Sequence, residues 1–221
     1  GRRPTATRQR VARRGAAVAA RAAAGAAEGA APPATDEEAG SAVVEETVSL
    51  KDPATGREVP CVVRRRFDGD DGLPYALLLP VDTPIEVLAD DPVTDEMTDL
   101  NDGELDAILP LVSERLAARR LYVQNTAYCL TVRGAVRYSD EDIVSLDLGE
   151  DGDETAAEGV ELLGFEQDGV LYTIFTPVEA LIFVVSVAED GSMSLVPDER
   201  LGEPAIQWAL EAEHLAFDEE S

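Results

Sequence analysis

Histidine and cysteine are the side chains of this sequence best suited to nucleophilic or acid–base chemistry. His214 is the single histidine, so a centre built on histidine has little material, and we expect a surface or helix-terminal residue there. Cys61 and Cys129 are too few for a disulfide framework in a chain of 221 residues. We interpret both as small buried hydrophobic residues. The alternative is a redox-linked pair, which requires that the two sulfur atoms lie close together.

Two acidic segments are the candidates for a metal site. Asp68–Gly72 and Asp147–Glu154 contain closely spaced carboxylates. Neither places a glycine and a terminal glutamate as a calcium-binding EF-hand loop requires, so both are interpreted as solvated turns. The sequence also lacks the patterns Gly-x-x-x-x-Gly-Lys and Gly-x-Gly-x-x-Gly of phosphate-binding loops. It therefore predicts no catalytic residue, metal or cofactor, and we expect that the protein is not an enzyme.

Charge is the outlying feature of the composition. The formal net charge is −27, from 45 acidic and 18 basic side chains. The first 30 residues hold seven of the basic residues and one of the acidic residues, so residues 31–221 carry 11 basic and 44 acidic side chains, a formal charge of −33. Such a field repels nucleic acids, which are themselves anionic. We expect a protein partner with a basic surface, and simple solubility is the alternative use of the charge.

A basic run and an acidic stretch are the candidate partner-binding residues. Arg64, Arg65 and Arg66 are the sharpest positive feature of the acidic body. On a strand, Arg64 and Arg66 would share one face and Arg65 would take the other. They could receive an acidic partner, but the favoured interpretation is that they neutralise carboxylates of the chain itself. The acidic candidates are Asp140, Glu141, Asp142, Glu150, Asp151, Asp153 and Glu154.

The two ends of the chain differ from its body. Residues 1–31 are rich in arginine and alanine and poor in acids, which is typical of an organelle transit peptide, and a basic disordered tail is the alternative. Residues 32–42 are predicted to be a linker, and residues 218–221 an acidic tail. Val170–Ala188 is apolar, but Pro177 and Glu179 in its middle argue against a membrane span.

Alternating and helical spacings predict antiparallel β-structure with two helices. The helices are expected around Leu105–Leu116, where Pro110 implies a kink or a late start, and over Gly202–Phe217, where Pro204 lies in the first turn. The turn Glu166–Gly169 is a hairpin signal. Strands are expected at Val43–Leu50, Glu58–Phe67, Tyr75–Leu79, Ile85–Leu88, Tyr122–Gly134, Val136–Tyr138, Val160–Phe165, Val170–Phe175 and Ala180–Ala188.

An internal repeat organises these elements. Gly72–Val87 aligns with Gly169–Val184 at a constant offset of 97, and six of the 16 pairs are identical. They are Gly72/Gly169, Tyr75/Tyr172, Pro80/Pro177, Val81/Val178, Ile85/Ile182 and Val87/Val184. The repeat predicts an α+β fold of two similar units, each a small antiparallel β-sheet with one covering helix. The units are placed at residues 43–120 and 159–217, and residues 121–158 form an acidic insertion.

The motif also resembles a known group of proteins. A hairpin, then Tyr75-Ala-Leu-Leu-Leu-Pro80, a strand, an acidic loop and a short helix are similar to the small acidic YrzB-like bacterial proteins over residues 46–116, and more loosely over 160–215. The two-part arrangement behind a transit peptide resembles an uncharacterised domain family of cyanobacteria and plastids. The insertion Leu121–Glu158 departs from the single-unit pattern. This resemblance implies plastid targeting and supplies no catalytic residues.

The combined expectation is a non-catalytic accessory or assembly factor of the plastid stroma that binds a basic or partly assembled protein. The first alternative is a structural subunit of a larger plastid complex, which contributes a sheet edge or a helix face. An enzyme with an unrecognised site is the second alternative.

Overall fold

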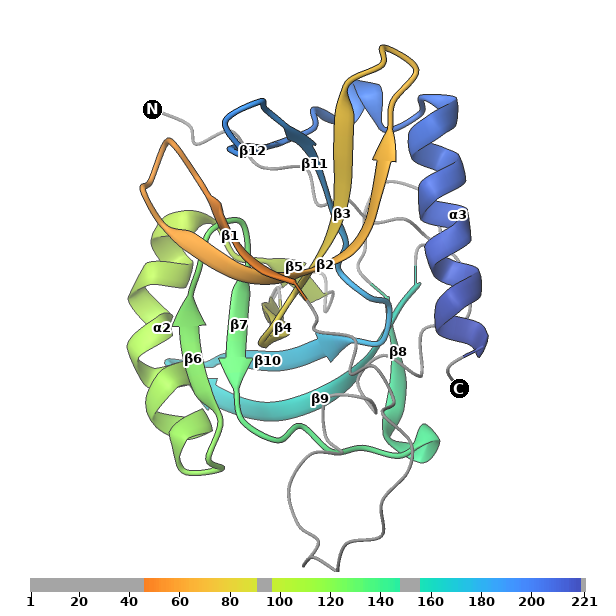
Figure 1. The fold of residues 1–221 in the computed structure, drawn as a ribbon. Helices are drawn as coiled ribbons and strands as arrows, with labels where there is room; N and C mark the ends of the chain where they lie inside the picture. Colours follow the sequence, from red (N-terminus) through yellow and green to blue (C-terminus); the bar gives the residue numbers. More distant parts are fainter. Residues whose placement is uncertain (1–45, 91–96, 148–155, 220–221) are drawn as a thin grey trace, which may run out of the picture.

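A computed structural model describes residues 46–90, 97–147 and 156–219. Within these ranges the chain forms twelve β-strands in two antiparallel sheets, two α-helices and two short 3₁₀ helices. The helices α2 (Asp102–Ala117) and α3 (Pro204–Glu219) lie on opposite sides of the molecule (Figure 1). The predicted α+β class is confirmed in its coarse form, although strands dominate. The predicted transit peptide or basic tail 1–31 and the predicted linker 32–42 both fall outside the described ranges, as do all of residues 1–45.

The first sheet has the strand order β1-β2-β3-β11-β12. The strands are β1 (Thr47–Lys51), β2 (Glu58–Asp68), β3 (Pro74–Pro80), β11 (Phe183–Val187) and β12 (Met193–Leu195). Helix α3 (Pro204–Glu219) runs beside β2 and β3 (Figure 1). Its residues Ile206 and Leu210 pack into one core cluster with Tyr75, Leu77 and Val184 from the sheet. Burial of this helical stripe fixes α3 on the sheet.

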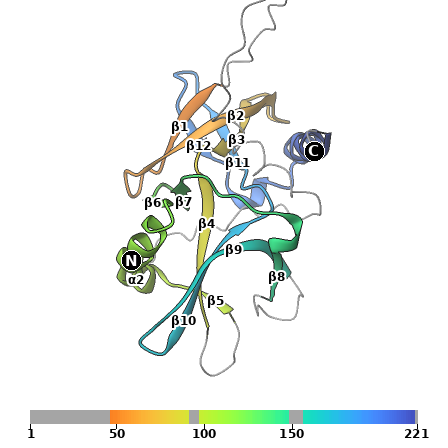
Figure 2. The ribbon, with the colours of Figure 1, turned by 90° about the horizontal axis from the view of Figure 1, so that it is seen from below.

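The second sheet has the order β6-β7-β4-β10-β9-β8, and β5 also pairs with β4. Figure 2 shows β4, β9, β10 and β8 from below the view of Figure 1. Helix α2 (Asp102–Ala117) supplies the buried residues Ile108, Val112 and Leu116 to the core of this sheet. The strands are β4 (Thr83–Asp90), β5 (Met97–Asp99), β6 (Tyr122–Asn125), β7 (Leu130–Arg133), β8 (Ile143–Asp147), β9 (Ala156–Gln167) and β10 (Val170–Pro177).

Local sequence signals explain where the helices begin. The Asn101 side chain accepts hydrogen bonds from the backbone N–H groups of Gly103 and Glu104. In return, the Glu104 carboxylate accepts a hydrogen bond from the Asn101 N–H. This capping box satisfies donors that a helix leaves without partners. Because of this capping box, α2 starts at Asp102, well before Pro110. Of the two alternatives that Pro110 implied, a kink or a late start, the late start is wrong. Pro204 lies in the first turn of α3, as predicted, because its missing N–H costs nothing there. The helix begins at Pro204 itself, two residues after the predicted start at Gly202.

The segment predicted as an insertion joins the two sheets. The hairpin β6–β7 pairs with β4 through β7, while Ala127 at its tip packs with Leu50 and Leu78 on the face of the first sheet opposite to α3. Polar contacts tie the tip down: Arg57 Nη1 donates to Asn125 Oδ1 at 2.6 Å, and the Ala127 N–H donates to the Glu58 carbonyl at 3.4 Å. The strand predicted at Val136–Tyr138 does not form.

The expected pair of separate sheets is not what the structure contains. In the first sheet Val184 pairs with Leu77, and in the second Ile174 pairs with Val87. Each sheet therefore combines strands from both sequence repeats. Short connections cause this exchange, because the turn at Val81 and Asp82 carries the chain from β3 to β4 in the other sheet. Residues 178–182 carry it back from β10 to β11.

Candidate protein-binding site

The three consecutive arginines of β2 all pair with carboxylates of the chain. Arg64 Nε lies 2.7 Å from Glu213 Oε1, and Arg65 Nε lies 3.5 Å from Glu213 Oε2. Arg66 Nη2 lies 2.6 Å from Glu46 Oε1. A register shift between Val63 and Arg65 brings both Arg64 and Arg65 to Glu213 on α3, so the predicted placement on opposite faces is wrong. The contacts support the interpretation that these arginines neutralise the chain's own acids.

Glu213 is the buried member of this cluster. Its side chain is 3% exposed, whereas those of Arg64 and Arg65 are 21% and 30% exposed. The Arg64 guanidinium also lies 4.8 Å from the centre of the Phe217 ring. A buried carboxylate is tolerated only when it is paired, so the two arginines hold α3 in one position against β2.

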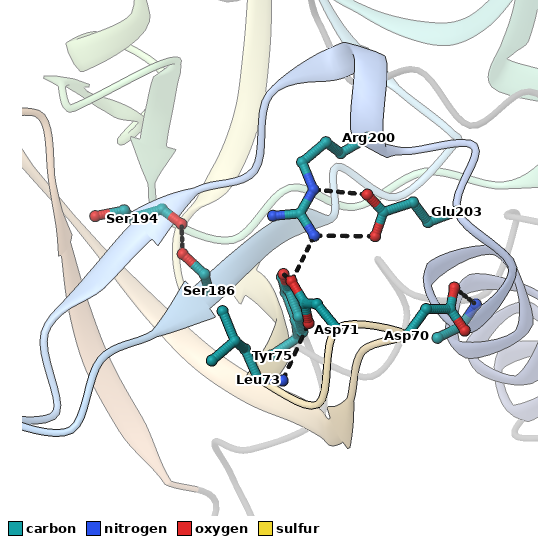
Figure 3. Close-up of polar contacts among 9 residues, drawn as sticks. Asp70, Asp71, Leu73, Tyr75, Ser186, Ser194, Arg200 and Glu203 are labelled. Carbon is teal, nitrogen blue, oxygen red and sulfur yellow. Dashed lines mark hydrogen bonds and ion pairs between the residues drawn. The ribbon is translucent and has the colours of Figure 1, made fainter.

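A second polar cluster joins the β2–β3 turn to the start of α3 (Figure 3). Asp71 accepts hydrogen bonds from the Leu73 N–H at 3.0 Å, from the Tyr75 hydroxyl at 2.8 Å and from Arg200 Nη2 at 2.8 Å. These bonds lower the pKa of Asp71 to about 2, with the Leu73 N–H as the largest cause. Arg200 also donates to both carboxylate oxygens of Glu203, at 2.6 and 3.0 Å. The predicted solvated turn therefore anchors the approach to α3.

The neighbouring Asp70 acts on the helix itself. Its Oδ2 accepts a hydrogen bond from the Ala205 N–H at 3.3 Å (Figure 3). A carboxylate at a helix N-terminus satisfies a free donor and opposes the positive end of the helix dipole. Together with Arg200 and Glu213, it fixes α3 at both its first and its later turns.

The outer side of α3 carries two exposed apolar side chains. Trp208 is 60% exposed and Leu215 is 66% exposed, and they lie two helical turns apart with the exposed Glu211 between them. Arg65 supports Trp208 from beneath, with its guanidinium 5.9 Å from the ring centre. Trp208 was not among the sequence candidates, although its position two residues after the core residue Ile206 places it on the opposite side of a helix.

The acidic candidates are only partly described. Asp140, Glu141 and Asp142 form an exposed 3₁₀ turn before β8. Asp142 accepts hydrogen bonds from the Ser139 N–H at 2.7 Å and from its hydroxyl at 2.9 Å, which lower the pKa of Asp142. Glu150, Asp151, Asp153 and Glu154 lie outside the described residues, as does most of the acidic segment Asp147–Glu154.

The two cysteines share one apolar cluster. Cys61 is buried and Cys129 packs against the same cluster at the tip of the β6–β7 hairpin. Burial, with a smaller effect of Cys129, raises the pKa of Cys61 to about 12, so its thiol stays protonated at neutral pH. His214 is half-buried within α3, and its Nε2 has no hydrogen-bond partner among the described residues. The expected surface or helix-terminal position of His214 is met only in part, because the residue is half-buried and α3 continues to Glu219.

Two further features bear on ligands. Among the residues that the structure describes, no three His, Cys, Asp or Glu side chains are grouped so as to hold a metal ion. A surface pocket of about 270 Å³ lies between the end of α2 and β9, lined in part by Arg119, Arg137, Asp142 and Glu161. Its mixed charges define no single class of ligand. Neither described helix is long and apolar enough to cross a membrane.

Comparison with known proteins gives a match to a family model of unknown function that covers part of the chain. Residues 120–216 match the model of a family described as "Protein of unknown function (DUF3727)". No curated protein and no solved structure matches the chain. The match starts at the β6–β7 hairpin and ends in α3, so one family model covers both the segment predicted as an insertion and the second repeat. It supports the expected similarity to an uncharacterised domain family.

Proposed function

We propose that the protein is a non-catalytic, acidic accessory or assembly factor that binds a basic or partly assembled protein. The observation that carries this proposal is that several arginines are paired with the chain's own carboxylates and so do not offset the remaining acids. Arg64, Arg65, Arg66, Arg133 and Arg200 are all engaged with carboxylates of the chain, while most other acids face solvent. The outward field is therefore strongly negative and attracts cationic surfaces over long range.

The proposal includes a place of action in the plastid stroma. The arginine-rich and acid-poor residues 1–31 support a transit peptide. The Tyr-x-Leu-Leu-x-Pro pattern of Tyr75–Pro80, of which the second copy keeps Tyr172 and Pro177, supports similarity to the YrzB-like proteins and to cyanobacterial and plastid relatives. Imaging of the full chain fused to a fluorescent protein at its C-terminus tests this part. Accumulation in the cytosol of a plant cell would contradict it.

A structural subunit of a larger complex is the second candidate, because the exposed Trp208 and Leu215 on α3 suit a permanent interface as well as a transient one. Native electrophoresis of organelle extract separates the two. An accessory factor runs mostly as a free chain, and a subunit co-migrates with its complex.

The test of the leading proposal is the association rate as a function of ionic strength, with a partner recovered from native extract. We expect the rate to fall steeply as salt rises above about 0.1 M, where charges are screened within roughly 10 Å. The variant Asp140→Asn/Glu141→Gln/Glu158→Gln should associate more slowly. The matched control Asp140→Glu/Glu141→Asp/Glu158→Asp keeps the charge and should bind as the wild type does. A rate that is independent of salt would refute the proposal.

A further inference from the structure

We propose that the outer face of α3, formed by Trp208, Glu211 and Leu215, is a docking surface for a basic amphipathic helix of a partner protein. The proposal rests on the proposed function for the charge of the partner, and it adds the place of contact and the form of the bound segment.

The two halves of the chain provide an internal comparison for α3. In the repeat alignment, with its offset of 97, Leu77 matches Ile174 and Val184 matches Val87. The strand pair Val184–Leu77 of the first sheet therefore corresponds to the pair Val87–Ile174 of the second sheet. The register shifts in β2–β3 and β9–β10 fall opposite matching residues, Leu77–Leu78 and Ile174–Phe175. Helix α3 packs on Leu77 and Val184, and α2 packs on the matching residues Ile174 and Val87, so the two helices occupy equivalent positions.

The apolar residues on the outside of α3 are not required for this packing. Matching the buried positions Ile108 with Ile206 and Val112 with Leu210 places Pro110 at the position of Trp208. The same match places Ala117 at the position of Leu215. Helix α2 thus covers its sheet without a large exposed apolar side chain at either position. Two such residues on α3, each more than half exposed, point to a role outside the fold.

The α3 face is also held ready for binding. Arg65 lies under the Trp208 ring and is itself positioned by Glu213 and by the Ala212 carbonyl, 3.4 Å from its Nη2. The later turns of α3 are held by the pairing of Glu213 with Arg64, and the start of the helix is held by the hydrogen bond between Asp70 and the Ala205 N–H. A tryptophan ring that already rests against Arg65 on a fixed helix loses less entropy when a partner covers it, and tryptophan is common among binding hot spots.

The charges around the outer face of α3 indicate that the partner segment is basic. Glu211 lies between the two apolar residues, and Asp198 and Glu199 are exposed just before the helix. A second copy of this chain carries the same strong negative charge and is repelled. A helix with apolar side chains at spacings of three and four residues, and with lysine or arginine around them, complements both the apolar pair and the acids.

The probe is a synthetic, fluorescently labelled helix of about 18 residues with leucine along one face and lysine elsewhere, added to the full chain. Trp208 is the single tryptophan, so its emission should shift to shorter wavelength as the probe covers it. In anisotropy titrations at about 0.15 M salt, Trp208→Ala and Leu215→Ser should each weaken binding about tenfold. Tyr122→Ala, which removes a 54% exposed aromatic ring on the other sheet, is the matched control and should bind as the wild type does.

Equal affinity of the wild type and both α3 variants would overturn the docking site. If that binding still weakened steeply with salt, the acidic body would remain the attractant and the proposed function would stand. Two other results also overturn the partner helix as occupant. One is self-association of the chain that Trp208→Ala abolishes, and the other is tighter, Trp208-dependent binding of a peptide of residues 1–31 than of the synthetic helix.

Discussion

Because the carboxylate of Glu213 is buried, removing its arginine partners on β2 should lower the free energy of unfolding more than removing the carboxylate itself. Replacing Arg64 and Arg65 together by methionine keeps much of their apolar volume but leaves a carboxylate that is 3% exposed without its cations. Breaking a buried pair in this way costs about 3–5 kcal/mol. For a domain of this size, that corresponds to a fall in Tm of roughly 6–20 °C.

Removing the carboxylate instead should cost far less. In Glu213→Met the two arginines are left, but their heads are already 21% and 30% exposed and can turn to water. We expect a loss within about 1 kcal/mol, and the triple methionine variant should recover most of the stability that the double arginine variant loses. In the second sheet, the residue at the matching register shift is the core residue Leu162. The position of Arg64 at the shift in the first sheet is therefore one where an apolar side chain can pack.

Urea unfolding of the four full-length chains, monitored by circular dichroism, measures these differences. The reasoning is refuted if Glu213→Met is as destabilising as the double arginine variant. It is also refuted if the triple variant stays as unstable as the double, because the arginines would then act through the packing of their stems and not through charge.

Two other outcomes follow from perturbed pKa values. The folded-state pKa of Asp71 is about 2 against an ordinary 3.8, so its contribution is complete above pH 4 and is lost as pH falls towards 2. Asp71→Asn should therefore destabilise the protein at pH 6 more than at pH 3 in urea unfolding, and an equal loss at both would contradict the hydrogen bonds from Leu73, Tyr75 and Arg200 that lower this pKa. Because burial raises the pKa of Cys61 to about 12, iodoacetamide at pH 8 should label Cys129 first under native conditions, by mass spectrometry. Equal labelling rates would contradict the buried position of Cys61.

Local signals in the sequence predicted much of the secondary structure. The hairpin at Glu166–Gly169 forms as expected, with Asp168 and Gly169 both at positive φ, the conformation that a tight two-residue turn needs. The spacing of Ile108, Val112 and Leu116 predicted α2, and Ile206 and Leu210 predicted α3. The three-residue strands β5 and β12 were missed, because pairing with a neighbour, and not periodicity, defines such short strands.

The arrangement of the strands and the candidate site depended on long-range contacts. Six identical pairs revealed the repeat, but no local signal indicated that β3 pairs with β11 from the other repeat and not with β4, the next strand of its own repeat. The burial of Glu213 and its choice of Arg64 and Arg65 likewise join residues about 150 positions apart. Charge composition predicted an acidic surface, whereas the position of Trp208 on that surface required the packing of α3 to be known.

The central claim is that the acidic surface brings a basic partner in and that α3 holds it. The most direct measurement is the pair of association and dissociation rates for one partner with three chains: the wild type, Asp140→Asn/Glu141→Gln/Glu158→Gln, and Trp208→Ala. We predict that the charge variant lowers the association rate several-fold and leaves dissociation unchanged, since exposed charges steer encounters. Trp208→Ala should raise the dissociation rate about tenfold with little effect on association. Rates that are the same for all three chains would contradict the claim.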